Sequence, residues 1–184
     1  MKLGHIILTP NELLMWHGAM TIEIGLHGNV EASLLEVIKL IDINVLEQRM
    51  RAPIIVIDGR VPDEQDPNEI LELVQVLKRK NYTVFGKISG AVWPRWAEHC
   101  SKIAAMVTNE PWLGFSCDEL QYIPPVGGPL VEPNIGAAGS ALKNLYIGNK
   151  LPPAEVFAFL SQAQVPWQIT TAAKFNYVLT VVKE

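Results

Sequence analysis

Charged residues, cysteines and long apolar runs are all scarce in this 184-residue sequence. Only 18% of the residues are charged while 49% are hydrophobic, a composition typical of a folded globular protein. Because the cores of protein interfaces are poor in charge, the shortage predicts a further buried surface. We expect that surface to serve either a homo-oligomer or a protein partner.

The two cysteines, Cys100 and Cys117, belong to no Cys-x-x-Cys pair and to no zinc-ligand cluster. This usage fits the reducing cytoplasm and argues against a disulfide framework. No apolar run approaches the roughly 20 residues that span a bilayer, and residues 1–10 are too short and too soon interrupted for a signal peptide. We therefore expect a cytoplasmic protein without a membrane partner.

Basic residues are too few and too scattered to predict a nucleic-acid partner. The sequence has 15 basic and 19 acidic residues, a net charge of −4, and its only basic run is 78–80. Such a triplet is typical of a solvated helix end rather than of a broad nucleic-acid surface.

What the sequence does contain is a β-loop-α-β unit at residues 54–90. Residues 54–57 are apolar and β-branched throughout, as in a strand buried on both faces, and a loop with glycine follows. Asp66 and Pro67 are suited to begin a helix, and apolar residues recur at helical spacing from Ile70 to Leu77. A second strand is predicted at 83–90.

Similar patterns extend over the rest of the chain. Strands are predicted at 6–8, 21–26, 104–108, 113–116, 119–123, 145–147, 167–171 and 177–182, and helices at 31–48, 94–103 and 153–164. A turn is predicted at 27–29 and an irregular loop rich in glycine and proline at about 124–140. In the helix at 31–48 we expect Leu34, Leu35, Val37, Ile38 and Ile41 to face inward. The pattern predicts one α/β domain over 1–184, a partial (β/α) barrel with a mostly parallel sheet.

Ligands of parallel α/β sheets bind outside the carboxyl ends of the strands, which makes Asp58, Arg60, Lys87 and Ser89 candidate ligand-binding residues. Arg60 and Lys87 together can hold a phosphate or a carboxylate. The alternative is a structural salt-bridge cluster, because Asp58 and residues 63–64 are acidic and close to Arg60 in sequence. Trp93 follows the second strand. It either lines the same binding site at the strand ends, packs in the core or belongs to an interface.

The order of these segments resembles the radical S-adenosylmethionine enzymes, and most of all the 7-carboxy-7-deazaguanine synthase family. In that family one strand ends in Gly-Gly-Glu-Pro, a helix follows, and the next strand ends in Glu-Thr-Asn-Gly. Residues 54–62, 70–80 and 83–90 occupy these positions in the same order and at similar spacing. Residues 94–96, 118–122 and 167–174 also resemble family segments, so that the resemblance covers roughly 14–175.

The departures from this family lie in its cofactor site. Residues 26–33 stand where the family carries three cysteines, and they contain none. A [4Fe–4S] cluster of this class needs three thiolates, so we expect no cluster and no cofactor. Arg60 stands near the position of the family glutamate, which binds the ammonium group of the cofactor. Lys87 stands where the next family motif has a carboxylate. His27 and Asn29, in the segment without cysteines, complete the ligand-binding candidates.

Other catalytic patterns are missing. The histidines His5, His17, His27 and His99 show no spacing that fixes two ligands on one metal, and no nucleophile elbow or phosphate loop is present. Catalytic residues are therefore unknown. Two hypotheses remain open: a non-catalytic binding or assembly protein on a radical S-adenosylmethionine-like fold, and an enzyme or sensor that binds a small anionic molecule such as a deazapurine or a nucleotide.

Overall fold

The computed structural model describes residues 1–11, 15, 18–59, 65–89, 93–107, 116–124, 130, 133, 141–147, 153–163, 167–171 and 177–179. Its strands are β1 (Lys2–Pro10), β2 (Met20–Glu31), β3 (Ile54–Asp58), β4 (Thr83–Ser89), β5 (Lys102–Val107), β6 (Glu119–Tyr122), β7 (Leu142–Ile147), β8 (Gln168–Thr171) and β9 (Tyr177–Leu179). Its helices are α1 (Leu34–Glu47), α2 (Pro67–Arg79), the 3₁₀-helix η2 (Arg95–His99) and α3 (Pro153–Gln162).

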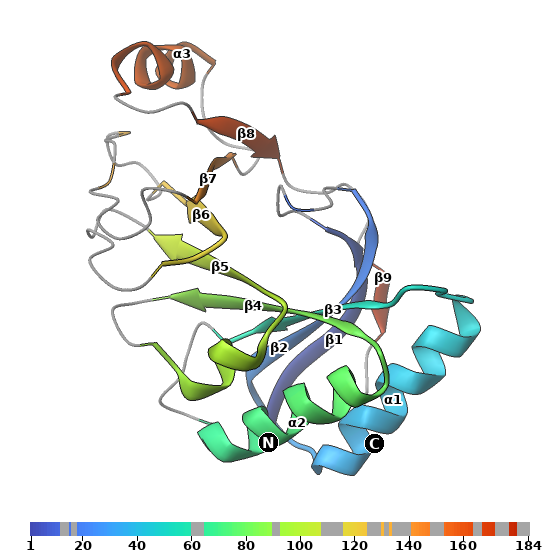
Figure 1. The fold of residues 1–184 in the computed structure, drawn as a ribbon. Coiled ribbons are helices and arrows are strands. Elements are labelled where there is room, and N and C mark those ends of the chain that lie inside the picture. The colour runs from blue at the N-terminus through green and yellow to red at the C-terminus, as the bar shows by residue number, and fades with distance from the viewer. Residues whose placement is uncertain are drawn as a thin grey trace.

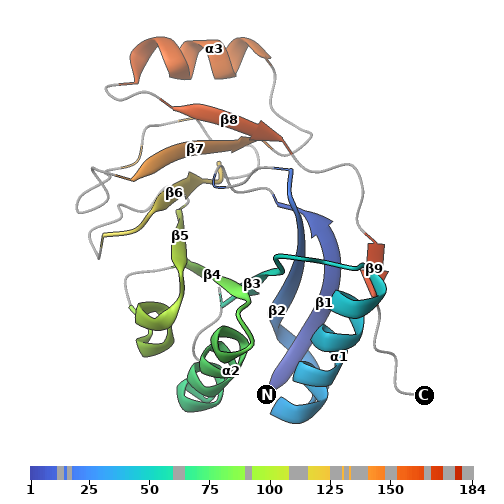
Figure 2. The same cartoon turned by 45° about the vertical axis from the view of Figure 1, so that its right-hand side comes forward.

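The nine strands among the described residues form one sheet in the order β8-β7-β6-β5-β4-β3-β2-β1-β9 (Figure 1). Strands β2 to β8 are parallel and follow chain order, whereas β1 is antiparallel to both β2 and β9. The sheet twists strongly, so that β8 lies nearly across the direction of β1 (Figure 2). The predicted α/β class with a mostly parallel sheet is confirmed.

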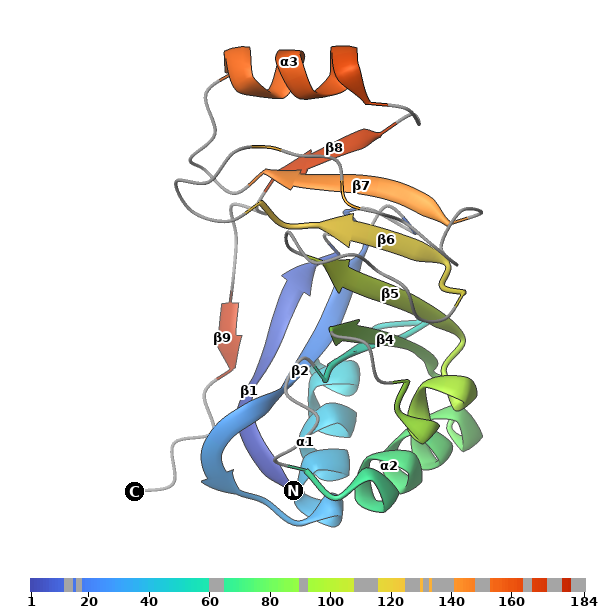
Figure 3. The same ribbon diagram turned by 90° about the vertical axis from the view of Figure 1, so that its left-hand side faces the viewer.

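Helices α1 and α2 lie side by side on one face of the sheet (Figure 3), as same-handed connections between neighbouring parallel strands require. Local sequence determines where both begin. Ser33 and Glu36 form a capping box at the start of α1, and Asp66 accepts a hydrogen bond from the Asn68 N–H at the start of α2. Pro67 follows at the first helical position, where its missing N–H costs nothing.

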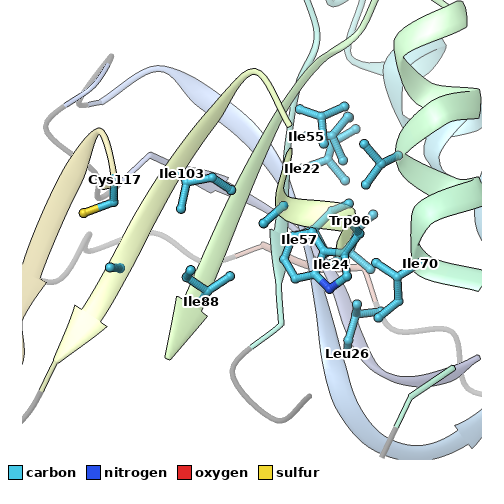
Figure 4. Packing of buried hydrophobic residues seen from close by; sticks show 14 of the residues in the cluster. Ile22, Ile24, Leu26, Ile55, Ile57, Ile70, Ile88, Trp96, Ile103 and Cys117 are labelled. Carbon is cyan, nitrogen blue, oxygen red and sulfur yellow. The ribbon is translucent and has the colours of Figure 1, made fainter. Parts of the chain in front are cut away.

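The two faces of the sheet differ in chemistry because successive side chains of a strand point to opposite faces. The face under the helices, which we call the helix face, carries the apolar core, including Ile22, Ile24, Ile55 and Ile57 (Figure 4). Phe159 of α3 extends this core through ring contacts with Tyr122 at 6.0 Å and Trp167 at 5.7 Å.

Trp96 of η2 is a large side chain buried beneath the strands, with 2% of its surface exposed. Its indole lies against Gly86 of β4, where an added Cβ would approach Trp96 Cζ3 to 2.8 Å. Such an approach is closer than real Cβ contacts allow, so that glycine at this position gives the ring its space. A side chain at position 86 would displace the indole from the core.

Several sequence predictions need correction. Residues 27–29 are not a turn but part of β2, which continues to Glu31 by pairing with β1. Leu35 does not face inward, since 60% of its surface is exposed. Residues 113–115 of the predicted strand at 113–116 and most of the loop at 124–140 lie outside the described residues.

The predicted β-loop-α-β unit is confirmed as β3, α2 and β4, and the buried residues of α2 include Ile70, Leu73, Val74 and Leu77. Within the ranges that the structure describes, no helix combines the length and the apolar character needed to cross a bilayer.

Candidate functional site

The face opposite the helices, which we call the polar face, carries most of the buried polar side chains. Strand register places residues that pair across neighbouring strands on the same face, and the row Gly25, Asp58, Lys87, Ala104 and Glu119 runs across five strands in this way. Buried polar residues of this face are Thr21, Asp58, Lys87, Glu119, Gln121 and Asn144. Burying so many polar groups is costly unless each is paired.

A cluster of three charged or polar side chains, His5, Glu23 and Lys87, occupies one end of the polar face. Lys87 Nζ extends from β4 past β3 and donates a hydrogen bond of 2.5 Å to Glu23 Oε2 on β2. The other carboxylate oxygen, Oε1, lies 3.4 Å from His5 Nε2. Only 6% of the Lys87 side chain and 13% of the Glu23 side chain are exposed, so this ion pair is largely shielded from solvent.

The environment of Glu23 strongly favours its ionised form. Burial alone raises the pKa of a carboxyl group, but the hydrogen bond with His5 and the charge of Lys87 outweigh it and lower the pKa of Glu23 from 4.5 to about 2. Glu23 is therefore a carboxylate at neutral pH and neutralises Lys87. It is not available as a general acid.

His27 lies beside this cluster. Its ring meets the ring of His5 edge to face, with 5.3 Å between centroids. The His5 ring in turn rests on the backbone of Gly25, where an added Cβ would collide with His5 Cε1. His27 Nδ1 is buried and has no hydrogen-bond partner among the described residues. Buried polar atoms without a hydrogen-bond partner are uncommon in folded proteins.

A second polar pair, Glu119 on β6 and Asn144 on β7, lies further along the same face. Asn144 Nδ2 donates to Glu119 Oε1 at 2.8 Å, and both side chains are fully buried. Glu119 Oε2 also accepts a hydrogen bond of 3.3 Å from the Met15 backbone N–H, in the connection between β1 and β2. Met15 therefore lies over the polar face, close to Glu119.

Between the two clusters is a small apolar patch on the same face. Met15 packs there against Val56, Phe85 and Ala104. The polar face thus has two hydrogen-bonded groups separated by an apolar centre.

The structure brings together only part of the predicted site. Asp58 and Lys87 are register partners at the carboxyl ends of β3 and β4, and Ser89 follows on the same face. Arg60 lies outside the described residues. Trp93 packs partly buried against the core of the helix face, and Asn29 is exposed in the part of β2 that extends beyond its pairing with β3.

Sequence reasoning missed the partners that complete the site. From the sequence His5 was tested only as a metal ligand, and Glu23, Glu119 and Asn144 had no predicted role. In β6 the signal was present, because Glu119 and Gln121 alternate with Leu120 and Tyr122. Within the part of the chain that the structure describes, no group of His, Cys, Asp and Glu is arranged to hold a metal ion.

The fold and site together define an α/β protein with a mostly parallel sheet, helices α1 and α2 on one face and a buried polar network on the other. Searches of protein-family models, of curated proteins and of solved structures found no match for this chain.

Proposed function

We propose that this chain is a non-catalytic binding or assembly protein on a partial (β/α) barrel that resembles the radical S-adenosylmethionine fold without its cluster. Parallel strands in chain order with helices on one face are the arrangement of a (β/α) barrel, whose inner surface would be the polar face. The observation that carries the proposal is the 2.5 Å ion pair between Lys87 and Glu23. In this pair Glu23 neutralises the ammonium group of Lys87, which is the cation that an anionic substrate would need.

The cysteines also support a protein without a cluster. Residues 26–33, at the position of the family's cysteine loop, lie at the end of β2 and the start of α1. Burial raises the pKa of Cys100 to about 12 and that of Cys117 to about 11. Because the thiolate is the metal ligand, burial disfavours the form of both side chains that binds iron.

We expect the purified protein to remain colourless and free of stoichiometric iron after anaerobic reconstitution with iron and sulfide, and to bind no S-adenosylmethionine by calorimetry. The reason is that such a cluster needs three thiolates and the sequence has two cysteines. The double variant Cys100→Ser, Cys117→Ser measures adventitious iron. The proposal would be refuted if the wild-type protein were brown with about four irons per chain and the double variant lacked this iron.

A second candidate function, binding of a small anionic or planar molecule, is favoured by the buried Nδ1 of His27. A neutral imidazole nitrogen can donate or accept one hydrogen bond, and the ion pair of Glu23 and Lys87 beside it carries no net charge. The ligand classes to test are nucleotides, deazapurines and small carboxylates.

For this second candidate we expect a thermal-shift screen to give a compound that raises the melting temperature by a few degrees at about 100 times its dissociation constant. The variant His27→Phe keeps an aromatic ring at this position but removes Nδ1, so the shift in melting temperature should disappear. The matched control His99→Phe changes an exposed histidine of η2 and should keep it. An equal shift in His27→Phe, or no active compound, counts against this function.

A further inference from the structure

The end of strand β2 leaves its regular pairing with β1 in a wide bulge. Leu3 of β1 pairs with Val30 of β2, whereas His5 pairs with Gly25. Residues 26–29 of β2 therefore form the bulge, which begins directly after the last residue of β2 that pairs with β3. Bulges re-aim side chains and are frequent beside functional sites.

Gln65, in the connection before α2, holds this bulge in place. Its Nε2 donates hydrogen bonds to the carbonyl oxygens of Leu26 at 3.0 Å and Lys2 at 2.7 Å, and its Oε1 accepts one of 2.9 Å from the Lys2 N–H. Only 8% of Gln65 is exposed, so water competes little for these bonds. Gln65 thus satisfies backbone groups of β1 and β2 at the point where regular pairing is interrupted.

The bulge holds the ring of His27 beside that of His5 on the polar face. The backbone around His27 packs closely against β1, since an added Cβ at Gly28 would collide with Leu3 O. Nδ1 of the His27 ring is buried and has no hydrogen-bond partner within the part of the chain that the structure describes. An unpaired hydrogen-bonding atom is therefore held just beyond the carboxyl end of β3, where ligands of parallel α/β sheets bind.

The charges beside His27 do not favour an anion. The ammonium group of Lys87 is 2.5 Å from the Glu23 carboxylate and is already neutralised by it. Asp58 is the register partner of both Gly25 and Lys87, so its carboxyl group lies on the same face. An anionic ligand would compete with Glu23 for Lys87 and would approach Asp58, whereas an uncharged ligand avoids both costs.

We propose that His27 binds an uncharged planar ring through Nδ1, and that Gln65 is a positioning residue that acts by holding the bulge. This inference rests on the second candidate function and names its ligand class. A neutral imidazole nitrogen either donates or accepts one hydrogen bond, and a ring that carries an amide group offers both an N–H and a carbonyl oxygen. Such a ring can also pack against the imidazoles of His27 and His5.

Calorimetry with matched compounds tests the ligand class. Uracil and nicotinamide carry an amide group without charge, and orotate and nicotinate are the corresponding carboxylates. We expect an uncharged compound to bind and its carboxylate to bind at least about tenfold more weakly, because the carboxylate meets the charges of Glu23 and Asp58. His27→Phe should lower the affinity for the uncharged compound by about tenfold, the effect of one lost hydrogen bond. In nitrogen NMR spectra the Nδ1 signal of His27 should shift on binding, while that of the exposed His99 should not.

A second pair of variants tests the role of Gln65. Gln65→Leu keeps a similar volume but removes the three hydrogen bonds to the bulge and β1. It should lower the affinity by about tenfold and change the ring signals of His27 in the free protein. Ser33→Ala removes the capping box of α1, outside the bulge, so it should lower the melting temperature and leave the affinity unchanged. If Gln65→Leu also leaves the affinity unchanged, Gln65 has no positioning role.

The compounds separate failure of this inference from failure of the second candidate function. A carboxylate that binds as well as its uncharged counterpart, with binding lost in His27→Phe, overturns the inference and leaves that function in place. Binding that persists in His27→Phe also overturns the inference. If none of these compounds binds, the inference fails, and the thermal-shift screen with nucleotides and other carboxylates still decides the second candidate function.

Discussion

Replacing Lys87 with methionine is expected to lower the free energy of unfolding by about 3–5 kcal/mol. Methionine fills a similar volume, so the loss comes from charge: Glu23 would remain 13% exposed without its cation. An unpaired carboxylate in this position loses far more than the modest net gain of forming the pair. Urea unfolding followed by circular dichroism measures the difference.

A matched control is the variant Lys102→Met. Lys102 Nζ lies 2.6 Å from Asp118 Oδ1, but the two side chains are 44% and 34% exposed. Exposed pairs of this kind contribute about 0–1 kcal/mol. The double variant Glu23→Leu, Lys87→Met should recover part of the stability lost by Lys87→Met alone, because it removes both charges. If Lys87→Met and Lys102→Met lowered the free energy of unfolding equally, burial would not strengthen the ion pair of Glu23 and Lys87.

Acid unfolding gives a second measurement of the same pair. The pKa of Glu23 is lowered from 4.5 to about 2, so its ionised form stabilises the fold fully above pH 4.5 and this contribution is lost as the pH falls towards 2. The difference between the two pKa values of Glu23 corresponds to about 3 kcal/mol of the free energy of unfolding, at 1.36 kcal/mol per pKa unit. Glu23→Gln should lack this component of the acid dependence, and Lys87→Met should reduce it.

Truncation of Trp96 to alanine is expected to cost about 3–5 kcal/mol, again a large part of the stability of a domain. The indole is 2% exposed and lies against Gly86, which has no side chain that can move into the space left behind. The cavity therefore adds to the lost burial of apolar surface. Thermal and urea unfolding should both show the loss, with the far-UV spectrum retained below the transition.

Trp96→Phe keeps an aromatic ring in the same place and should cost clearly less than Trp96→Ala. Phe157→Ala removes a ring that is 73% exposed, and its effect should stay within about 0.5 kcal/mol. A loss below about 1 kcal/mol for Trp96→Ala would mean that η2 repacks beneath β3 and β4.

The sequence was most informative where local chemistry alone decides the structure. Buried strand β3 was evident from its β-branched residues, and α2 from Asp66, Pro67 and the helical recurrence of apolar residues. The extension of β2 through His27 and Asn29 could not be read in this way, because glycine and asparagine favour turns locally and pairing with β1 overrides that preference.

The site was harder to predict because its pairs join different strands. The alternation of polar and apolar residues in 21–26 indicates that Thr21 and Glu23 share one face of their strand, and register with β1 and β3 agrees with it. It could not pair Glu23 with Lys87, because a lysine two strands away comes within reach only once the order β4-β3-β2 is known. The outward position of Leu35 was also missed, since a leucine in an apolar helix does not itself show which side faces the sheet.

The strand order has a consequence for how the chain reaches its native state. From β2 to β8 each strand pairs with the next one in the sequence, so pairing can advance along the chain by closing one connection at a time. The contact between β1 and β9 is different, because it joins Ile7 to Val178. Closing so long a segment has the largest entropic cost in the sheet, and that cost is lowest once β2 to β8 are already assembled. We therefore expect the pairing of β1 with β9 to form last.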